Sequence, residues 1–186
     1  MTPTARAEAV HECLWPGGAA ASSTWAVLDG ARDARIYPAL QVSRLDPLCL
    51  YSGALPARLQ QAAPYLIEIH PGHAFTWRLL DEGWGRSWGI FLRVREPDML
   101  RPHLRRLLRV EDETGRRLVF RFYDPRVLRR YLPTCTGEEV KQVFGPISHL
   151  LLEDGDGAAA LQFSFDRRGL QRLRVPLSRA AAAAPG

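Results

Sequence analysis

Residues 88–108, WGIFLRVREPDMLRPHLRRLL, contain the change of pattern that decides the fold class. The stretch opens with WGIFLRV, an apolar run of the length of a β-strand. From Pro97 onward, apolar residues recur every three or four positions with arginines between them, which is the pattern of an amphipathic helix. Proline suits the first position of such a helix because an N–H there has no partner within the helix. The stretch therefore predicts a strand over 88–94 and a helix over 97–108.

The same alternation of strand and helix continues on both sides of this unit. Apolar runs predict strands over 24–29, 48–52, 65–69, 116–123, 149–153 and 159–165. Helical patterns fall between them, over 33–43, 56–63, 73–82, 125–132 and 138–144. This order predicts an α/β (α+β) domain with a mixed sheet. The short crossover helices favour partly parallel pairing of the first strands, and the last two strands flank the turn DGDG as a late β-hairpin.

The two ends of the chain differ in composition from this central part. Residues 1–22 are mostly small and polar, and we expect them to form a flexible lead-in. Residues 167–186 end in the low-complexity stretch RVPLSRAAAAAPG, and we expect a disordered tail there. The prediction is therefore a single domain over 23–166.

The cysteines and the N-terminus indicate the cellular compartment. Cys13, Cys49 and Cys135 are far apart and form no CxxC pair, which argues against a disulfide framework and a cysteine zinc cluster. Glu8 and Glu12 fall where a signal peptide needs an apolar run. The sequence also has no run of about 18 apolar residues, the length that crosses a membrane. We expect a cytoplasmic protein that does not associate with membranes.

Standard catalytic signatures are missing from the sequence. It contains no phosphate-binding GxxxxGK[ST] loop, no GxGxxG and no GxSxG. His70 and His73 flank a Pro-Gly turn without further ligands at the spacing of a metal site. Cys135 and His149 could form a thiolate–base pair, but no third residue is evident to orient it. We therefore expect no enzymatic activity, no cofactor, no metal and no small-molecule substrate.

Positive charge is concentrated in one central segment. The chain has a formal net charge of +5, and residues 101–130 alone contain ten arginines and four acidic residues. With Phe120, Phe122 and Tyr123 nearby, this composition resembles a stacking platform for nucleic acid. Strand alternation, however, places Phe120 and Phe122 on the same face as Leu118, which we expect in the core. A basic nucleic-acid-binding module is therefore the alternative function.

Aromatic and arginine side chains at turns suggest a preformed surface that binds a protein. The clearest case is GWGRSWG, residues 83–89, which holds two of the five tryptophans. Its tryptophans either pack into the core below a tight turn or anchor a partner, since Trp and Arg are frequent hot-spot residues. Asp124, before Pro125, could instead cap a helix. The candidate partner-binding residues are Tyr51, Trp84, Arg86, Trp88, Tyr123, Asp124 and Arg126.

The order of these segments resembles the adaptor, or effector-chaperone, family of bacterial type VI secretion systems, which is also called domain of unknown function 4123. The similar strings run in order from Trp25 to Glu153, and GWGRSWG and FRFYDPRVLRRYLPTC are the most distinctive of them. The resemblance implies a non-enzymatic cytoplasmic adaptor that binds an effector toxin protein and helps load it onto the VgrG spike protein. Many members have a longer, variable C-terminal region than this sequence, so a minimal adaptor is expected.

Overall fold

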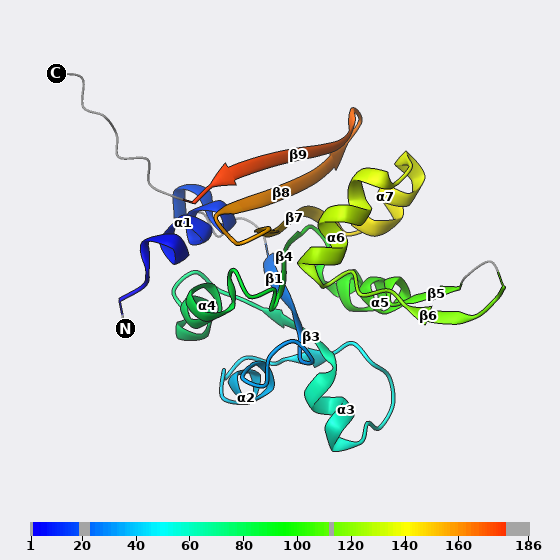
Figure 1. The fold of residues 1–186 in the computed structure, drawn as a ribbon, viewed down its shortest axis with the longest axis horizontal. Helices are drawn as coiled ribbons and strands as arrows, with labels where there is room; N and C mark the ends of the chain where they lie inside the picture. The colour runs from blue at the N-terminus through cyan, green and yellow to red at the C-terminus, as the bar shows by residue number, and fades with distance from the viewer. Residues whose placement is uncertain (1, 19–22, 112–113, 178–186) are drawn as a thin grey trace.

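An antiparallel β-sheet forms the centre of the molecule (Figure 1). The computed structural model describes residues 2–18, 23–111 and 114–177. In these residues, seven strands form one sheet in the order β2-β3-β1-β4-β7-β8-β9, and each neighbouring pair is antiparallel. These strands are β1 (Ser23–Asp29), β2 (Leu48–Cys49), β3 (Pro64–Glu68), β4 (Gly89–Val94), β7 (Ile147–Asp154), β8 (Ala159–Asp166) and β9 (Gly169–Pro176).

Helices cover both faces of this sheet. They are α1 (Ala5–Leu14), α2 (Ile36–Gln41), α3 (Ala57–Ala62), α4 (Ala74–Arg78), α5 (Pro97–Leu107), α6 (Pro125–Tyr131) and α7 (Gly137–Phe144). Shorter helical turns are η1 (Pro16–Gly18), η2 (Leu79–Gly83) and η3 (Leu132–Thr134). In Figure 1, α1, α2 and α4 lie on one side of the sheet, and α5, α6 and α7 lie on the other. The described part of the chain contains no helix that is both long enough and apolar enough to cross a membrane.

Alternate side chains of the central strands enter two separate apolar clusters. Leu28 of β1 and Phe91 of β4 pack on the side of α1 and α4. Val27 of β1 and Leu92 of β4 pack on the side of α5 and α6. Successive side chains of a strand point to opposite faces. A strand that is buried on both faces therefore has apolar side chains at nearly every position. The domain is therefore an α+β protein with one sheet between two helical layers.

The expected partly parallel pairing is wrong. The connection through α2 does make β2 run in the same direction as β1, because both strands are antiparallel to β3. However, β3 lies between them, so the two strands with the same direction are not neighbours. The short helical connections misled the prediction, because a connection through a helix can lead to a strand two positions away in the sheet, as α2 does between β1 and β2.

The flexible lead-in expected over 1–22 is also wrong for most of its length. Residues 5–14 form α1, whose first turn is capped by the side chain of Thr4. Ala7, Val10 and Leu14 are buried and follow the helical spacing, although their small sizes gave only a weak apolar pattern. Arg93 of β4 donates to the carbonyl oxygen of Leu14, with Nε 3.1 Å away, and so ties the end of α1 to the sheet.

The disordered tail expected over 167–186 is wrong for the first part of that range. Residues 169–176 form β9, which pairs along its whole length with β8, from Asp166↔Gly169 to Ala159↔Pro176. As an edge strand, β9 needs only backbone pairing on one side, so its arginine-rich sequence is compatible with a strand. Residues 178–186 lie outside the described part of the chain. The single folded unit therefore includes α1 and β9 as well as the predicted domain.

A separate two-stranded sheet stands beside α5. It consists of β5 (Arg109–Glu111) and β6 (Arg117–Val119). The predicted strand over 116–123 is thus too long, because the chain turns after β6 and Asp124 N–H donates to the carbonyl of Arg121. Phe122 is buried whereas Leu118 is exposed, so the expectation that these side chains share a core face is wrong.

Candidate functional site

The segment GWGRSWG forms a tight loop between η2 and β4. We call residues 84–88 the tryptophan loop. Gly85 has a φ of 81° and Ser87 a φ of 58°, so two of its residues adopt left-handed backbone conformations. For serine this conformation is unfavourable, and it persists only where the surroundings fix it. The loop therefore has a conformation that other parts of the protein must hold in place.

Glu153, at the end of β7, holds the tryptophan loop. The Gly85 N–H donates to Oε2 of Glu153 at 2.6 Å, and the Ser87 hydroxyl donates to Oε1 at 2.8 Å. Glu153 is itself buried. Burial raises the pKa of Glu153 above its ordinary value, although the hydrogen bonds from Ser87 and Gly85 oppose the rise. A buried carboxylate thus fixes the loop from beneath.

Both tryptophans of the loop point into the protein. Trp84 is 4% exposed, stacks near Phe91 with ring centroids 6.1 Å apart, and donates from Nε1 to the carbonyl of Gly157 at 2.9 Å. Trp88 is 3% exposed and donates from Nε1 to Oδ2 of Asp33 at 3.1 Å. The two rings therefore pack in the core and do not project from the surface as anchors for a partner. The surface above them consists of polar residues.

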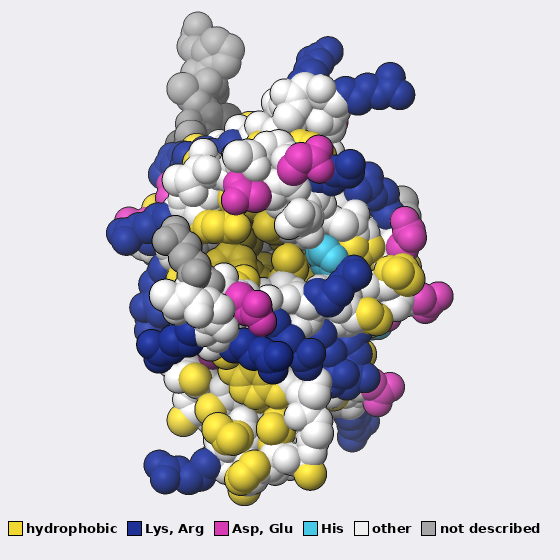
Figure 2. Space-filling model, turned by 90° about the vertical axis from the view of Figure 1, so that its right-hand side faces the viewer, with side chains coloured by type: hydrophobic (Ala, Val, Ile, Leu, Met, Phe, Trp, Pro, Cys, Tyr) yellow, Lys and Arg dark blue, Asp and Glu magenta, His cyan; other side chains and the backbone are white. Residues whose placement is uncertain are grey.

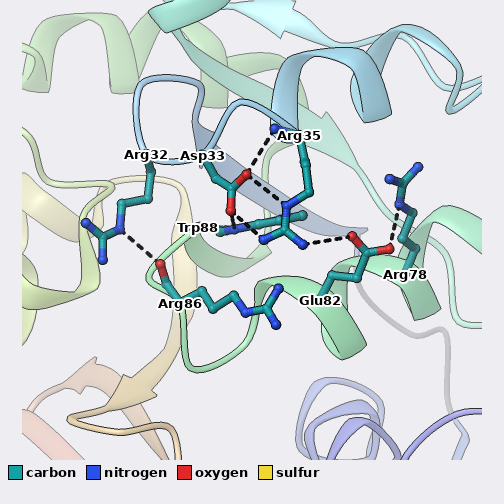
Figure 3. A network of polar contacts seen from close by, with 7 residues as sticks. All are labelled: Arg32, Asp33, Arg35, Arg78, Glu82, Arg86 and Trp88. Atoms are coloured by element: carbon teal, nitrogen blue, oxygen red, sulfur yellow. Dashed lines mark hydrogen bonds and ion pairs between the residues drawn. The ribbon is translucent and has the colours of Figure 1, made fainter.

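Those polar residues form a network that Figure 3 shows around Trp88. Arg35 binds Asp33 through two bonds, Nε to Oδ1 at 3.0 Å and Nη2 to Oδ2 at 2.6 Å, and lies over the Trp88 ring at 5.2 Å. The Nη1 of Arg35 also lies 3.8 Å from Glu82, which accepts a bond from Arg78 Nε at 3.0 Å. Hydrogen bonds from Arg35 hold the pKa of Asp33 well below its usual range.

The tryptophan loop joins this network through its own backbone. Nε of Arg32 donates to the carbonyl oxygen of Arg86 at 3.0 Å, while the Arg86 side chain is exposed. We call the set Arg32, Asp33, Arg35, Arg78, Glu82 and Arg86 the charged patch. Four guanidinium groups and two carboxylates give it a positive excess. Guanidinium groups bind carboxylates through paired hydrogen bonds, so the charged patch suits an acidic partner.

The other predicted residues gather where α6 begins. Asp124 accepts from the Arg126 N–H at 2.9 Å, which confirms Asp124 as the helix cap. Burial acts to raise the pKa of Asp124, but hydrogen bonds from Arg126 outweigh it, so the pKa is lowered. Tyr123 is buried and hydrogen-bonded to half-buried Tyr51, and burial raises its pKa above the ordinary range. Of these residues, Arg126 is the one whose side chain is well exposed.

Two buried carboxylates connect this group with the tryptophan loop. Asp29, at the end of β1, forms an ion pair with Arg121, and its N–H donates to the carbonyl of Trp88 at 2.8 Å. Hydrogen bonding to Asp124 raises the pKa of Arg126, and the charges of Asp29 and Glu153 raise it further. The structure therefore brings the predicted residues to one end of the central strands of the sheet, where β1 ends, β4 begins and β7 ends.

Sequence reasoning missed the residues that hold the tryptophan loop and the arginines around it in place. Glu153, Ser87, Arg35 and Glu82 were not among the candidates, although the acidic residue at the end of the apolar run of 149–153 was a visible signal. Their partners lie far away in sequence, as the bond between Ser87 and Glu153 illustrates. Charged residues at strand ends therefore indicate such anchoring better than aromatic residues do in this chain.

The thiol and the metal-ligating groups do not form a catalytic arrangement among the described residues. Cys135 donates from Sγ to the carbonyl of Tyr131 at 3.4 Å, and burial raises the pKa of the thiol, whereas an activated cysteine has a lowered pKa. Within residues 2–18, 23–111 and 114–177, no group of three or more His, Cys, Asp and Glu side chains is placed to hold a metal ion.

Replacing Asp124 with alanine is expected to lower the free energy of unfolding by about 1–2 kcal/mol, because α6 loses its cap. Asp124→Asn keeps an oxygen that can accept from the Arg126 N–H, so it should retain most of the stability. Urea unfolding followed by circular dichroism measures both values. Equal losses for the two variants would show that the cap is not the source of the effect.

The fold and the site define an α+β protein with a charged surface at one end of the central strands of its sheet. The model of the family described as Domain of unknown function (DUF4123) matches residues 24–142, and the chain belongs to this family. No curated protein and no solved structure matches the chain.

Proposed function

We propose that this protein is a cytoplasmic adaptor that binds a type VI secretion effector and helps load it onto the VgrG spike. The family membership and the resemblance of the motif strings support this proposal. The structural observation that carries it is the tryptophan loop: buried Glu153 fixes a strained backbone so that Arg86 is exposed within the charged patch. This is the arrangement of a preformed binding surface rather than of a reactive centre.

A fixed surface lowers the entropic cost of binding. Asp33 and Glu82 already hold Arg35 and Arg78 in place, so few side chains have to be ordered when a partner arrives. Arg32 is ordered in the same way by its bond to the loop carbonyl. The positive excess also attracts an acidic partner from a distance and raises the association rate. We therefore assign effector binding to the charged patch.

The basic surface of α5 favours a nucleic-acid-binding module as the second candidate. Arg101, Arg105, Arg106 and Arg109 line one hollow of about 700 Å³ together with Ser52. Such a cluster can neutralise several phosphates, and binding would weaken steeply as salt concentration rises. Salt-dependent retention on DNA of unrelated sequence, without binding to effector or spike, would favour this second candidate.

The charge reversal Arg86→Glu is expected to weaken effector binding by about tenfold or more, because it places a carboxylate among the partner's carboxylates. The measurement is the affinity for the purified effector encoded beside this gene, with a parallel pull-down of VgrG. Arg168→Glu is the matched control, since Arg168 is exposed on the β8–β9 turn.

Either of two results would overturn the proposal. The first is that the wild-type protein binds neither the effector nor the spike. The second, which concerns the site alone, is a folded Arg86→Glu variant that binds the effector as tightly as the Arg168→Glu control.

A further inference from the structure

The β5–β6 hairpin exposes more apolar surface than its size leads one to expect. Val110 is 38% exposed, Leu118 42% and Val119 58%, although the two strands contain six residues in all. A hairpin of two strands is marginally stable in water by itself. In Figure 1 it extends away from the large sheet beside α5. Apolar side chains on a projecting hairpin are typical of a surface that another molecule covers.

A groove of about 710 Å³ lies between the hairpin and residues 50–52, which follow β2. Leu108, Val110 and Leu118 contribute apolar side chains on the hairpin side, and Leu50 and Tyr51 contribute to the opposite wall. We call this the hairpin groove. Figure 2 views the molecule from the side to which the hairpin extends and shows many Lys and Arg side chains on this face, with hydrophobic side chains among them.

The charged residues of the hairpin groove are mainly arginines. Arg105 is fixed by donating from Nη2 to the carbonyl of Tyr51 at 2.9 Å, and Arg109 donates from Nη2 to the Ser52 hydroxyl at 3.3 Å. Arg117 is almost fully exposed and lies 3.5 Å from Glu111, the one carboxylate that the described residues contribute to the lining. Among the described residues of the lining, three guanidinium groups stand against one carboxylate, so the described part of the groove has a positive excess.

We propose that the hairpin groove binds a protein segment in which carboxylates alternate with apolar side chains. The apolar walls take the apolar side chains, and the arginines pair with the carboxylates. A nucleic acid would use the arginines but would leave Val110, Leu118 and Val119 uncovered. A second copy of this chain, with its net charge of +5, would bring like charges together.

This inference deepens the proposed adaptor function, on which it rests. The charged patch is built on the loop after β1, on α4 and η2 and on the tryptophan loop, whereas the hairpin groove is built on α5, β5, β6 and the residues around β2. The two surfaces share no residue. One chain can therefore hold two protein partners at once, which is what loading a cargo onto a carrier requires.

The test uses the full chain and three short labelled peptides, with binding measured by fluorescence anisotropy. The first peptide alternates Glu and Val, the second Lys and Val, and the third Glu and Ser. The Glu–Val peptide should bind about tenfold or more tightly than the other two, since it alone offers both carboxylates and apolar side chains. Equal binding of all three peptides, or no binding of the first, would overturn the inference.

Two pairs of variants locate the binding. Val119→Glu should weaken binding of the Glu–Val peptide about tenfold, whereas Val42→Glu, at a valine that is 71% exposed on another part of the surface, should leave it unchanged. Arg117→Glu should act like Val119→Glu, and Arg168→Glu should act like Val42→Glu. Because the side chains of Val119 and Arg117 are exposed, these variants are expected to fold.

Other occupants of the groove give different results. Single-stranded DNA that binds more tightly than the Glu–Val peptide and is lost in Arg117→Glu would assign the groove to nucleic acid and overturn the inference. A dimer in light scattering that Val119→Glu dissociates would assign it to a second copy, with the same consequence. If the Glu–Val peptide binds but effector and spike do not, the proposed adaptor function is wrong. The hairpin groove would then still be a binding site for a protein segment with carboxylates and apolar side chains.

Discussion

Glu153→Ala is expected to lower the free energy of unfolding by about 3 kcal/mol, because it leaves one buried and one part-buried donor of the tryptophan loop without an acceptor. These donors are the Gly85 N–H and the Ser87 hydroxyl, which bind Glu153 at 2.6 Å and 2.8 Å. The matched control is Asp154→Ala at the next residue, whose carboxylate pairs with the half-exposed Arg174. An exposed pair of this kind contributes about 1 kcal/mol or less.

Urea unfolding measures both variants, and effector affinity gives a second readout. Since the loop positions Arg86, Glu153→Ala should also weaken effector binding, whereas Asp154→Ala should not. A loss of stability no greater in Glu153→Ala than in Asp154→Ala would show that the carboxylate does not hold the loop.

The effect of Glu153 on stability should depend on pH. Burial raises the pKa of Glu153 in the folded protein above the ordinary value of about 4.3 that it regains on unfolding. Between these two values the folded state keeps a proton that the unfolded state has lost, so stability decreases as pH rises through this window. Alanine has no such proton, and the stability lost in Glu153→Ala should therefore be larger at a pH near the ordinary value than at neutral pH. A loss that grows as pH rises would contradict this assignment.

Gly157→Ala is expected to destabilise the protein by about 3 kcal/mol, through strain and a backbone clash. Gly157 has a φ of 79°, and a Cβ there would lie 2.7 Å from the Cα of Gly85 in the tryptophan loop. Its carbonyl also accepts the hydrogen bond from Trp84 Nε1. The substitution therefore pushes apart two loops that meet through backbone atoms.

Gly155→Ala separates these two causes. Gly155 also has a positive φ, 49°, but a Cβ there meets no atom within 4 Å. It should cost about 1 kcal/mol from backbone strain alone. The measurements are urea unfolding and tryptophan fluorescence, since movement of Trp84 toward solvent shifts its emission to longer wavelength. Equal destabilisation by both substitutions would mean that the close approach of the loops does not matter.

Local features of the fold could be predicted from the sequence, and features that depend on distant residues could not. Asp124-Pro125 marked the start of α6, and the spacing of apolar residues after Pro97 marked α5, because both signals lie within a few residues. The pairing of β1 with β3 instead of β2 depends on which strand fills the space between them, and no local pattern encodes that choice.

In the candidate site, too, the local features could be predicted from the sequence and the features that depend on distant residues could not. The unusual string around Arg86 drew attention to the correct loop, but the orientation of Trp84 and Trp88 depends on Gly157 and Asp33, which lie elsewhere in the chain. Aromatic side chains at a turn can point either into the core or toward solvent. What decides between them is whether a distant partner is available for the indole N–H.

The position of β7 next to β4 has a consequence for the limits of this family. The family model matches residues 24–142 and so ends before β7, which supplies both the neighbouring strand of β4 and the carboxylate under the tryptophan loop. A fragment cut at the limits of the match would leave β4 at an open edge, and the cluster that contains Ile90 and Leu92 would lose the side chains of β7 and β8, among them Leu150 and Phe163. The matched stretch is thus smaller than the folded unit of this chain, and any recombinant piece of this protein intended for study has to extend to Pro176.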